Sequence, residues 1–212
     1  WIIACAWSWK STFIVENAIR LQNKKVLIIT YTTENIQQIK ELFTTTAWCI
    51  PWKIKIQSWF TFLLQEWVRP YQNHKYWGER ISWICFNNTN YNKRYISESN
   101  PAYYITKWNL IREDKVSEFT RKCNDISKWL IIKRLEKLYE YIYIDESQDL
   151  EWRDYNLISL LLESSINIVL VWDPRQKILN THRHNKNSWY HTIFDWLKKE
   201  KAPIHLHYIS HS

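Results

Sequence analysis

The chain has 212 residues, of which 46% are hydrophobic and 24% charged, enough apolar material for one full core, or for one core and a small insertion. Its 29 lysines and arginines against 21 aspartates and glutamates give a net charge of +8, which suits a polyanionic partner as well as ordinary solubility. The apolar runs are too short to cross a bilayer, which argues against a membrane protein. The four cysteines form no Cys-x-x-Cys pair, which argues against a zinc knuckle and a disulfide scaffold. We therefore expect a cytoplasmic protein.

The first part of the chain alternates predicted strands and helices. Residues 1–5, 26–30 and 53–57 are apolar or alternating segments, and we expect each to form a strand. Residues 11–22 and 34–43 carry apolar side chains at helical spacing between those strands. Strands that alternate with helices predict an α/β fold with a parallel sheet.

The middle of the chain is expected to be an insertion into that fold. From 69 to 109 the apolar pattern weakens, with many polar residues and two prolines, and helical periodicity resumes over 113–138. We therefore expect an α/β domain that is interrupted by a mainly helical subdomain. The predicted boundaries are 1–68 for the first part of the α/β domain, 69–130 for the inserted subdomain and 131–212 for the second part.

The sheet is expected to resume after the insertion. Residues 141–144 and 166–171 are apolar strands that flank a helix at 155–162. A last helix at 190–199 and a short strand at 204–209 complete the predicted elements.

A strand-to-helix junction near the start of the sequence carries the first candidate site. Residues 4–12 read Ala-Cys-Ala-Trp-Ser-Trp-Lys-Ser-Thr, at the point where a nucleotide phosphate loop lies in an α/β unit. Such a loop normally needs glycines because its amides must approach the phosphates closely, yet Trp7 and Trp9 stand in it. Lys10 is placed to reach the outer phosphates, and Ser11 to hold magnesium. Taken alone, the segment is also compatible with a strand-turn-helix junction that has an incidental Lys-Ser pair.

Two adjacent acids form the second candidate site. Asp145 and Glu146 come directly after the predicted strand at 141–144, and Gln148 follows them. Because the carboxyl ends of parallel strands meet at one edge of a sheet, we expect these side chains near Lys10. Asp145 is suited to hold magnesium, and Glu146 to position and deprotonate an attacking water. The bland alternative is a solvated strand end.

The motifs together resemble those of one enzyme family. Asp145-Glu-Ser-Gln-Asp149 resembles the Asp-Glu-x-Gln-Asp Walker B box of UvrD/Rep-like superfamily 1 DNA helicases. The loop at 4–11 is similar to that family's Ala-x-Ala-Gly-Ser-Gly-Lys-Thr/Ser, with tryptophan at both glycines, and Trp172-Asp-Pro-Arg-Gln176 is similar to its Gly-Asp-Pro-x-Gln sensor motif. The resemblance implies a RecA-like P-loop NTPase domain with a mainly helical insertion.

The same resemblance implies an activity, cofactors and partners. The chain would be the N-terminal motor domain of an ATP-dependent DNA helicase, which uses ATP and Mg²⁺ and binds single-stranded DNA. The resemblance also implies that the family's second motor domain, which supplies arginine fingers and a further DNA-binding wall, is missing from this chain. The alternative function is a nucleic-acid-binding module without ATP turnover, because Trp7 and Trp9 block the phosphate loop.

Individual roles follow from the resemblance. Lys10, Glu146 and Gln176 take catalytic roles, with Gln176 contacting the terminal phosphate, and Asp173 a supporting polar one. Ser11 and Asp145 are the implied magnesium ligands. The implied nucleotide-binding residues are Ala6, Trp7, Ser8, Trp9, Lys10, Ser11, Thr12 and Gln148.

Two looser matches carry a predicted interface for single-stranded DNA. The segment 30–35 is similar to a single-strand-binding motif and contributes Thr32, and Gln57-Ser-Trp59-Phe60 resembles a later motif that usually has His-Ser-Phe. Hydroxyls and amides at strand ends bind phosphate oxygens, and Trp59 or Phe60 could stack on a base. Both aromatics also have the helical spacing of core residues, so core packing remains an open alternative.

The composition fits an exchange of glycine for tryptophan, with one glycine against 15 tryptophans, where average usage gives roughly 15 glycines. Trp7 and Trp9 are expected in backbone conformations that favour glycine, at a strain of about 1 to 3 kcal/mol each. Trp172 is expected at a turn, without a packing role. Three further tryptophans lie in amphipathic stretches and are not interpreted as replaced glycines: Trp59, Trp67 and Trp196.

Overall fold

The computed structural model describes residues 2–5, 9–86, 96–173, 196, 197, 199 and 205–208, with 2–5 and 205–208 described by their backbone alone. The chain divides into two compact units, which we treat separately. The first contains Trp1–Trp59 and Glu136–Ser212, and the second contains Phe60–Leu135.

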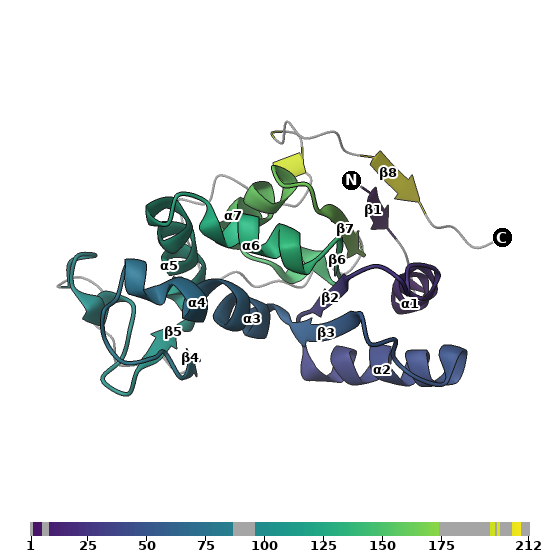
Figure 1. Cartoon of the computed structure of the whole chain (residues 1–212), viewed down its shortest axis with the longest axis horizontal. Helices are drawn as coiled ribbons and strands as arrows, with labels where there is room; N and C mark the ends of the chain where they lie inside the picture. Colours follow the sequence, from purple (N-terminus) through teal and green to yellow (C-terminus); the bar gives the residue numbers. More distant parts are fainter. Residues whose placement is uncertain are drawn as a thin grey trace. The chain divides into compact units, whose positions relative to one another are not determined.

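The first unit is built on a six-stranded sheet with the strand order β3-β2-β6-β7-β1-β8 (Figure 1). Every neighbouring pair in this sheet is parallel, which confirms the predicted α/β fold. Helical crossovers carry the chain back between such strands, because a parallel neighbour must start at the same end. The strands are β1 (Ile2–Cys5), β2 (Val26–Thr30), β3 (Ile54–Ser58), β6 (Tyr141–Ile144), β7 (Asn167–Trp172) and β8 (His205–Tyr208).

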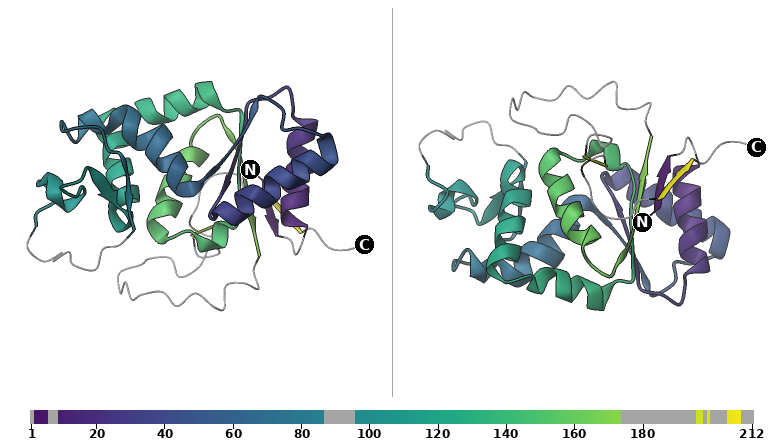
Figure 2. Two further views of the ribbon diagram at one scale, coloured as in Figure 1. Left: turned by 90° about the horizontal axis from the view of Figure 1, so that it is seen from below. Right: turned by 90° about the horizontal axis from the view of Figure 1, so that it is seen from above.

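Helices cover both faces of this sheet. Figure 2 shows α1 (Lys10–Arg20) and α2 (Thr33–Ala47) on one side of the strands and α7 (Trp152–Leu162) on the other. The inner strands β2, β6 and β7 are therefore largely buried, and β2 is buried along its whole length. The α1 and α2 face of the core contains Ile14, Val15, Ala18, Val26, Ile28, Ile39, Phe43, Ile54, Tyr143, Val169 and Val171.

The second unit is mainly helical within its described residues. The predicted helical stretch at 113–138 forms two helices, because Lys128 and Trp129 between them adopt the left-handed φ values of 53° and 67°. Its larger elements are α3 (Trp59–Phe62), the π-helix η1 (Leu63–Val68), α4 (Arg69–Tyr71), β4 (Trp83–Cys85), β5 (Leu110–Arg112), α5 (Glu113–Ile126) and α6 (Leu130–Leu138). Two of these helices, α3 and α6, include residues of both units. The strands β4 and β5 pair in parallel, and single 3-10 turns lie at Gln72–His74 and Pro101–Tyr103.

The tryptophans divide differently from the prediction. Trp172 is not at a turn: it is the last residue of β7, pairs with Cys5 and is only 2% exposed, because the sheet continues one residue further than expected. Trp9 caps α1 with a φ of −97°, so the strain predicted for it is wrong; Trp7 lies outside the described residues. The three tryptophans in amphipathic stretches are buried, namely Trp59, Trp67 and Trp196.

Two other tryptophans occupy backbone positions that favour glycine. Trp48 follows α2 with a φ of 64°, and Trp129 precedes α6 with a φ of 67°. A helix commonly ends in this left-handed conformation at a glycine, because a Cβ atom makes it costly.

Among the described helices, none has both the length and the apolar character needed to span a membrane.

Candidate active site

The candidate site lies at the carboxyl edge of the parallel sheet. β6 ends at Ile144, and the backbone N–H of Asp145 donates to the carbonyl of Ile29 at 2.8 Å, which extends the pairing with β2. Lys10 begins α1, the helix after β1. Its Nζ contacts Glu146 Oε2 at 2.5 Å, so the lysine and the acids meet at one edge of the sheet.

The Glu146 carboxylate is held by two donors. Lys10 Nζ and Gln148 Nε2 both donate to its Oε2, each at 2.5 Å. Glu146 has a φ of 50° and a ψ of 39°, a left-handed conformation that is uncommon for a residue with a side chain. Such strain persists where the surrounding structure enforces it, and it often marks functional sites.

Asp145 is a buried acid. It is 3% exposed, and its Oδ1 accepts the backbone N–H of Glu146 at 3.0 Å. Burial and, next, the nearby Glu146 raise the pKa of Asp145 to about 7, although the Lys10 charge opposes this. A cation would relieve this unfavourable charge, so the donor chemistry of Asp145 fits a divalent metal ion.

A hydrogen-bond network fastens the turn after the acids to β7. This turn, η4 (Ser147–Asp149), contains Ser147, whose Oγ donates to the carbonyl of Val171 at 3.1 Å. The Tyr155 hydroxyl in α7 donates to the carbonyl of Ser147 at 3.0 Å, and burial raises the pKa of Tyr155. Sequence reasoning missed both Ser147 and Tyr155, since nothing but the position of Ser147 inside the acidic motif marked them.

The predicted phosphate loop is described only in part. Trp9 is exposed at the start of α1, and Ser11 and Thr12 are half-buried in its first turn. The first N–H groups of a helix have no partner within the helix, and they attract anions. Four predicted site residues lie outside the described residues: Ala6, Trp7, Ser8 and Gln176.

The residues predicted to bind DNA have different environments. Thr32 is exposed, and its Oγ1 caps α2 by accepting the N–H of Asn35 at 3.1 Å. Gln57 is buried, and neither its amide nitrogen nor its amide oxygen has a hydrogen-bond partner within the described part of the chain. Trp59 is 1% exposed, which excludes it as a stacking platform in this structure and leaves core packing. Phe60 belongs to the second unit, where it is half-buried.

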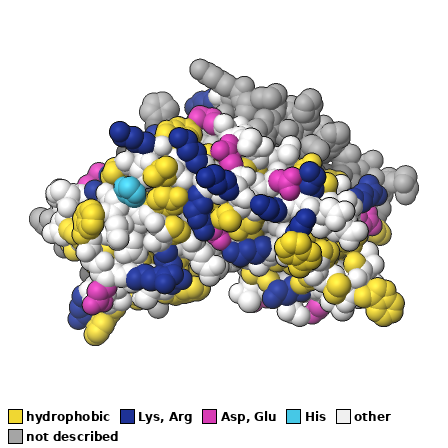
Figure 3. Space-filling model, viewed as in Figure 1, with side chains coloured by type: hydrophobic (Ala, Val, Ile, Leu, Met, Phe, Trp, Pro, Cys, Tyr) yellow, Lys and Arg dark blue, Asp and Glu magenta, His cyan; other side chains and the backbone are white. Residues whose placement is uncertain are grey.

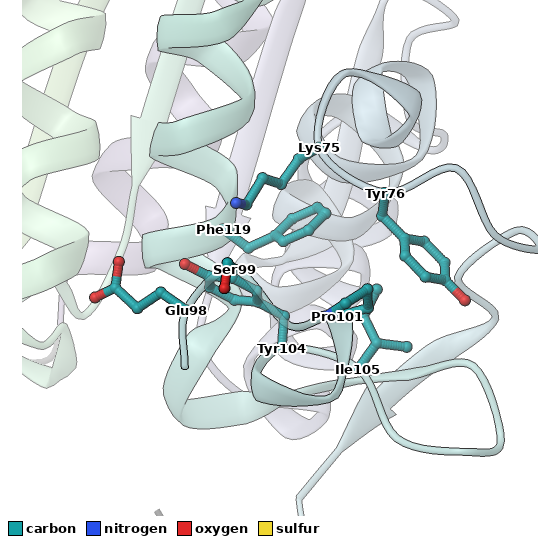
Figure 4. Close-up of a pocket in the computed structure, with 8 residues that line it drawn as sticks. All are labelled: Lys75, Tyr76, Glu98, Ser99, Pro101, Tyr104, Ile105 and Phe119. Atoms are coloured by element: carbon teal, nitrogen blue, oxygen red, sulfur yellow. The ribbon is translucent and has the colours of Figure 1, made fainter. Parts of the chain in front are cut away.

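The second unit contains a small pocket beside α5. Figure 4 shows Lys75 and Glu98 among its lining residues, with Tyr104 between them. Lys122, which lies over the Tyr104 ring, pairs with both Glu98 and Glu118. Glu98 and Glu118 offset the charge of Lys122, so we assign the pocket no ligand.

A lysine at the start of the helix after β1, facing an acid pair at the end of a nearby parallel strand, defines the class of protein. The domain is a RecA-like P-loop NTPase fold. Residues 116–184 match the family model of the UvrD/REP helicase N-terminal domain, and the chain matches no curated protein. The match includes the Asp145-Glu146 pair and supports the resemblance to UvrD/Rep-like helicases that the motifs indicate.

Proposed function

We propose that this chain is the ATP-binding motor domain of an ATP-dependent DNA helicase or translocase, which hydrolyses ATP with magnesium and moves on single-stranded DNA. The observation that carries the proposal is the contact between Lys10 and Glu146, which are 136 residues apart in the chain. This contact brings a phosphate-binding amine and a water-activating carboxylate to one point, beside the buried Asp145.

Each side chain then has a defined task. The positively charged Lys10 side chain binds the phosphates. The first-turn N–H groups of α1 bind them as well, because these groups carry partial positive charge and have no partner within the helix. Ser11 and Asp145 hold magnesium, which neutralises charge on the transferring phosphoryl group when bound. Glu146 accepts the proton of the attacking water. Gln176 is assigned to the terminal phosphate by its motif alone.

Nucleotide binding requires Lys10 to exchange its partner. In the structure its amine binds Glu146, and a phosphate group would compete with that carboxylate for the amine. Release from Lys10 removes the positive charge beside Glu146, which favours transfer of a proton from water to this carboxylate. The arrangement thus supports activation of Glu146 by the binding of the substrate.

Binding of single-stranded DNA is the second part of the proposal. Thr32 is exposed after β2, where its hydroxyl group can reach a phosphate oxygen, whereas Gln57 is buried within β3 and is assigned to DNA by its motif alone. Lys and Arg side chains are numerous on the face of the molecule displayed in Figure 3, and the net charge is +8. Affinity should therefore fall with increasing salt. We further propose that the unit Phe60–Leu135 is the inserted subdomain of the motor.

The decisive experiment measures ATP binding and hydrolysis by this chain and by a variant with glycine at 7 and 9. We expect weak binding by the parent and tighter, magnesium-dependent binding by the variant, because two indoles leave the phosphate loop. Glu146→Gln in the glycine variant should keep ATP bound and abolish hydrolysis. Equal affinity in parent and variant would refute the assignment of the loop.

The alternative is a nucleic-acid-binding module without ATP turnover. It is favoured by one observation, the bulky Trp9 side chain directly before the phosphate-binding lysine. Salt-sensitive binding of single strands, with no ATP affinity in either version of the chain, would support it.

A further inference from the structure

The Gln148 side chain joins the catalytic acid to the strand beside it. Gln148 is buried; its Nε2 donates to Glu146 Oε2 at 2.5 Å, and its Oε1 accepts the backbone N–H of Asp173 at 3.3 Å. A backbone N–H can only donate, and an ionised carboxylate can only accept. The orientation of the amide is therefore set by its two partners, because a flipped amide would face a donor with a donor and an acceptor with an acceptor.

The backbone around Gln148 gives this connection a firm base. Ser147 Oγ binds the carbonyl of Val171, and the Tyr155 hydroxyl binds the carbonyl of Ser147. Both contacts are buried and hold η4 against the end of β7 and against α7. With the turn held in this way, the Gln148 side chain is a direct route between Glu146 and the backbone at Asp173.

We propose that Gln148 is a positioning residue, which holds the Glu146 carboxylate and transmits displacements of the Asp173 backbone to it. This inference rests on the proposed function, in which Glu146 must face the attacking water. Lys10 and Gln148 share one carboxylate oxygen, so when Lys10 turns to a phosphate, Gln148 remains as the partner of Glu146. Asp173 is the second residue of the motif that ends in Gln176, and a displacement of its backbone can reach Glu146 through the Gln148 amide.

This assignment differs from a direct contact with nucleotide. The resemblance implied that Gln148 binds the nucleotide, whereas in the structure both ends of its amide hydrogen-bond to the protein. Two variants separate the two bonds. Gln148→Glu keeps an oxygen for the Asp173 N–H and removes the donor to Glu146, whereas Gln148→Leu has a similar size and removes both bonds.

The first measurement is amide hydrogen exchange in the nucleotide-free chain, followed by NMR. The readout is the exchange rate of the Asp173 amide divided by that of the Asp145 amide, which bonds to Ile29 in the sheet. General destabilisation affects both amides and cancels in the ratio. We expect the ratio to rise about tenfold or more in Gln148→Leu, and to stay within about twofold in Gln148→Glu. An unchanged ratio in Gln148→Leu would overturn the proposal.

The second measurement tests transmission. Glu146→Ala should shift the backbone amide resonance of Asp173 in the parent chain and leave it unmoved in the Gln148→Leu background. A purely structural Gln148 would give equal shifts in both backgrounds, which would also overturn the proposal. No nucleotide is present in either measurement, so their failure leaves the ATP-binding test intact, and the reverse holds as well.

Discussion

Lys10 Nζ and Glu146 Oε2 form an ion pair of 2.5 Å at the carboxyl edge of the sheet. Both side chains are largely buried, with 9% and 17% of the side-chain surface exposed. In the proposed reaction the lysine binds phosphate and the glutamate activates water. Without nucleotide, the two side chains instead bind each other. Substrate binding and catalytic readiness are therefore two outcomes of the same exchange.

Removal of Lys10 should destabilise the folded chain. Lys10→Met leaves the Glu146 carboxylate with less compensation of its charge, and we expect the free energy of unfolding to fall by about 1 to 3 kcal/mol. Urea denaturation measures this change. A double-mutant cycle with Glu146→Gln should show coupling between the two positions, and strictly additive effects would contradict the pairing.

The stability of the chain should carry a pH signature of Asp145. Its pKa rises from 3.8 to about 7 on folding, so the folded state binds the proton more tightly and the stabilising contribution is complete below pH 4. That contribution is lost as the pH rises through about 7. Asp145→Asn should therefore be more stable than the parent by about 2 to 4 kcal/mol at pH 8, with little difference at pH 4. Denaturation curves at both pH values decide this.

Magnesium should offset the free-energy cost of the buried Asp145 charge. At pH 8, millimolar Mg²⁺ is expected to raise the Tm of the parent by a few degrees, because an ion that binds only the folded state stabilises it, and chelation should reverse the shift. Asp145→Asn is the matched control, since it keeps the shape of the side chain and loses the charge. An equal Tm shift in both proteins would place magnesium elsewhere.

Trp48 provides a test of the glycine positions. With a φ of 64° and 92% exposure, it bears backbone strain and makes little packing contact. Trp48→Gly should stabilise the chain by about 1 kcal/mol, because glycine adopts this conformation without a Cβ penalty. Trp52 is the control, because it is 87% exposed and does not have a positive φ. Trp52→Gly should therefore bring no gain in stability.

Trp172 should respond in the opposite direction. Its indole is 2% exposed at the end of β7, so Trp172→Gly removes a buried side chain and leaves a cavity. We expect a loss of about 3 to 5 kcal/mol in the free energy of unfolding. A stabilised Trp172→Gly chain would show that the pocket around the indole can close without cost.

The sequence predicted the elements of the sheet well and the surroundings of individual side chains less well. The strands at Val26–Thr30 and Tyr141–Ile144 match the prediction, because continuous apolar runs between polar residues have few other solutions. The environment of Trp172 could not be read in the same way, since it depends on where β7 stops beside β1. Gln148 is a similar case, because its partner Asp173 becomes a neighbour only when β7 lies next to β6.

The strand order also has a consequence for how the protein is made. β1 pairs with β7 and β8, so Ile2 meets Val169 and His205, which are synthesised long afterwards. Contacts of such high sequence separation form slowly, because a long loop must close first. The strand β1, which leads to the predicted phosphate loop, therefore pairs only after most of the chain has left the ribosome. If the proposed function holds, a newly made chain should bind ATP only after the sheet that supports the predicted phosphate loop is complete.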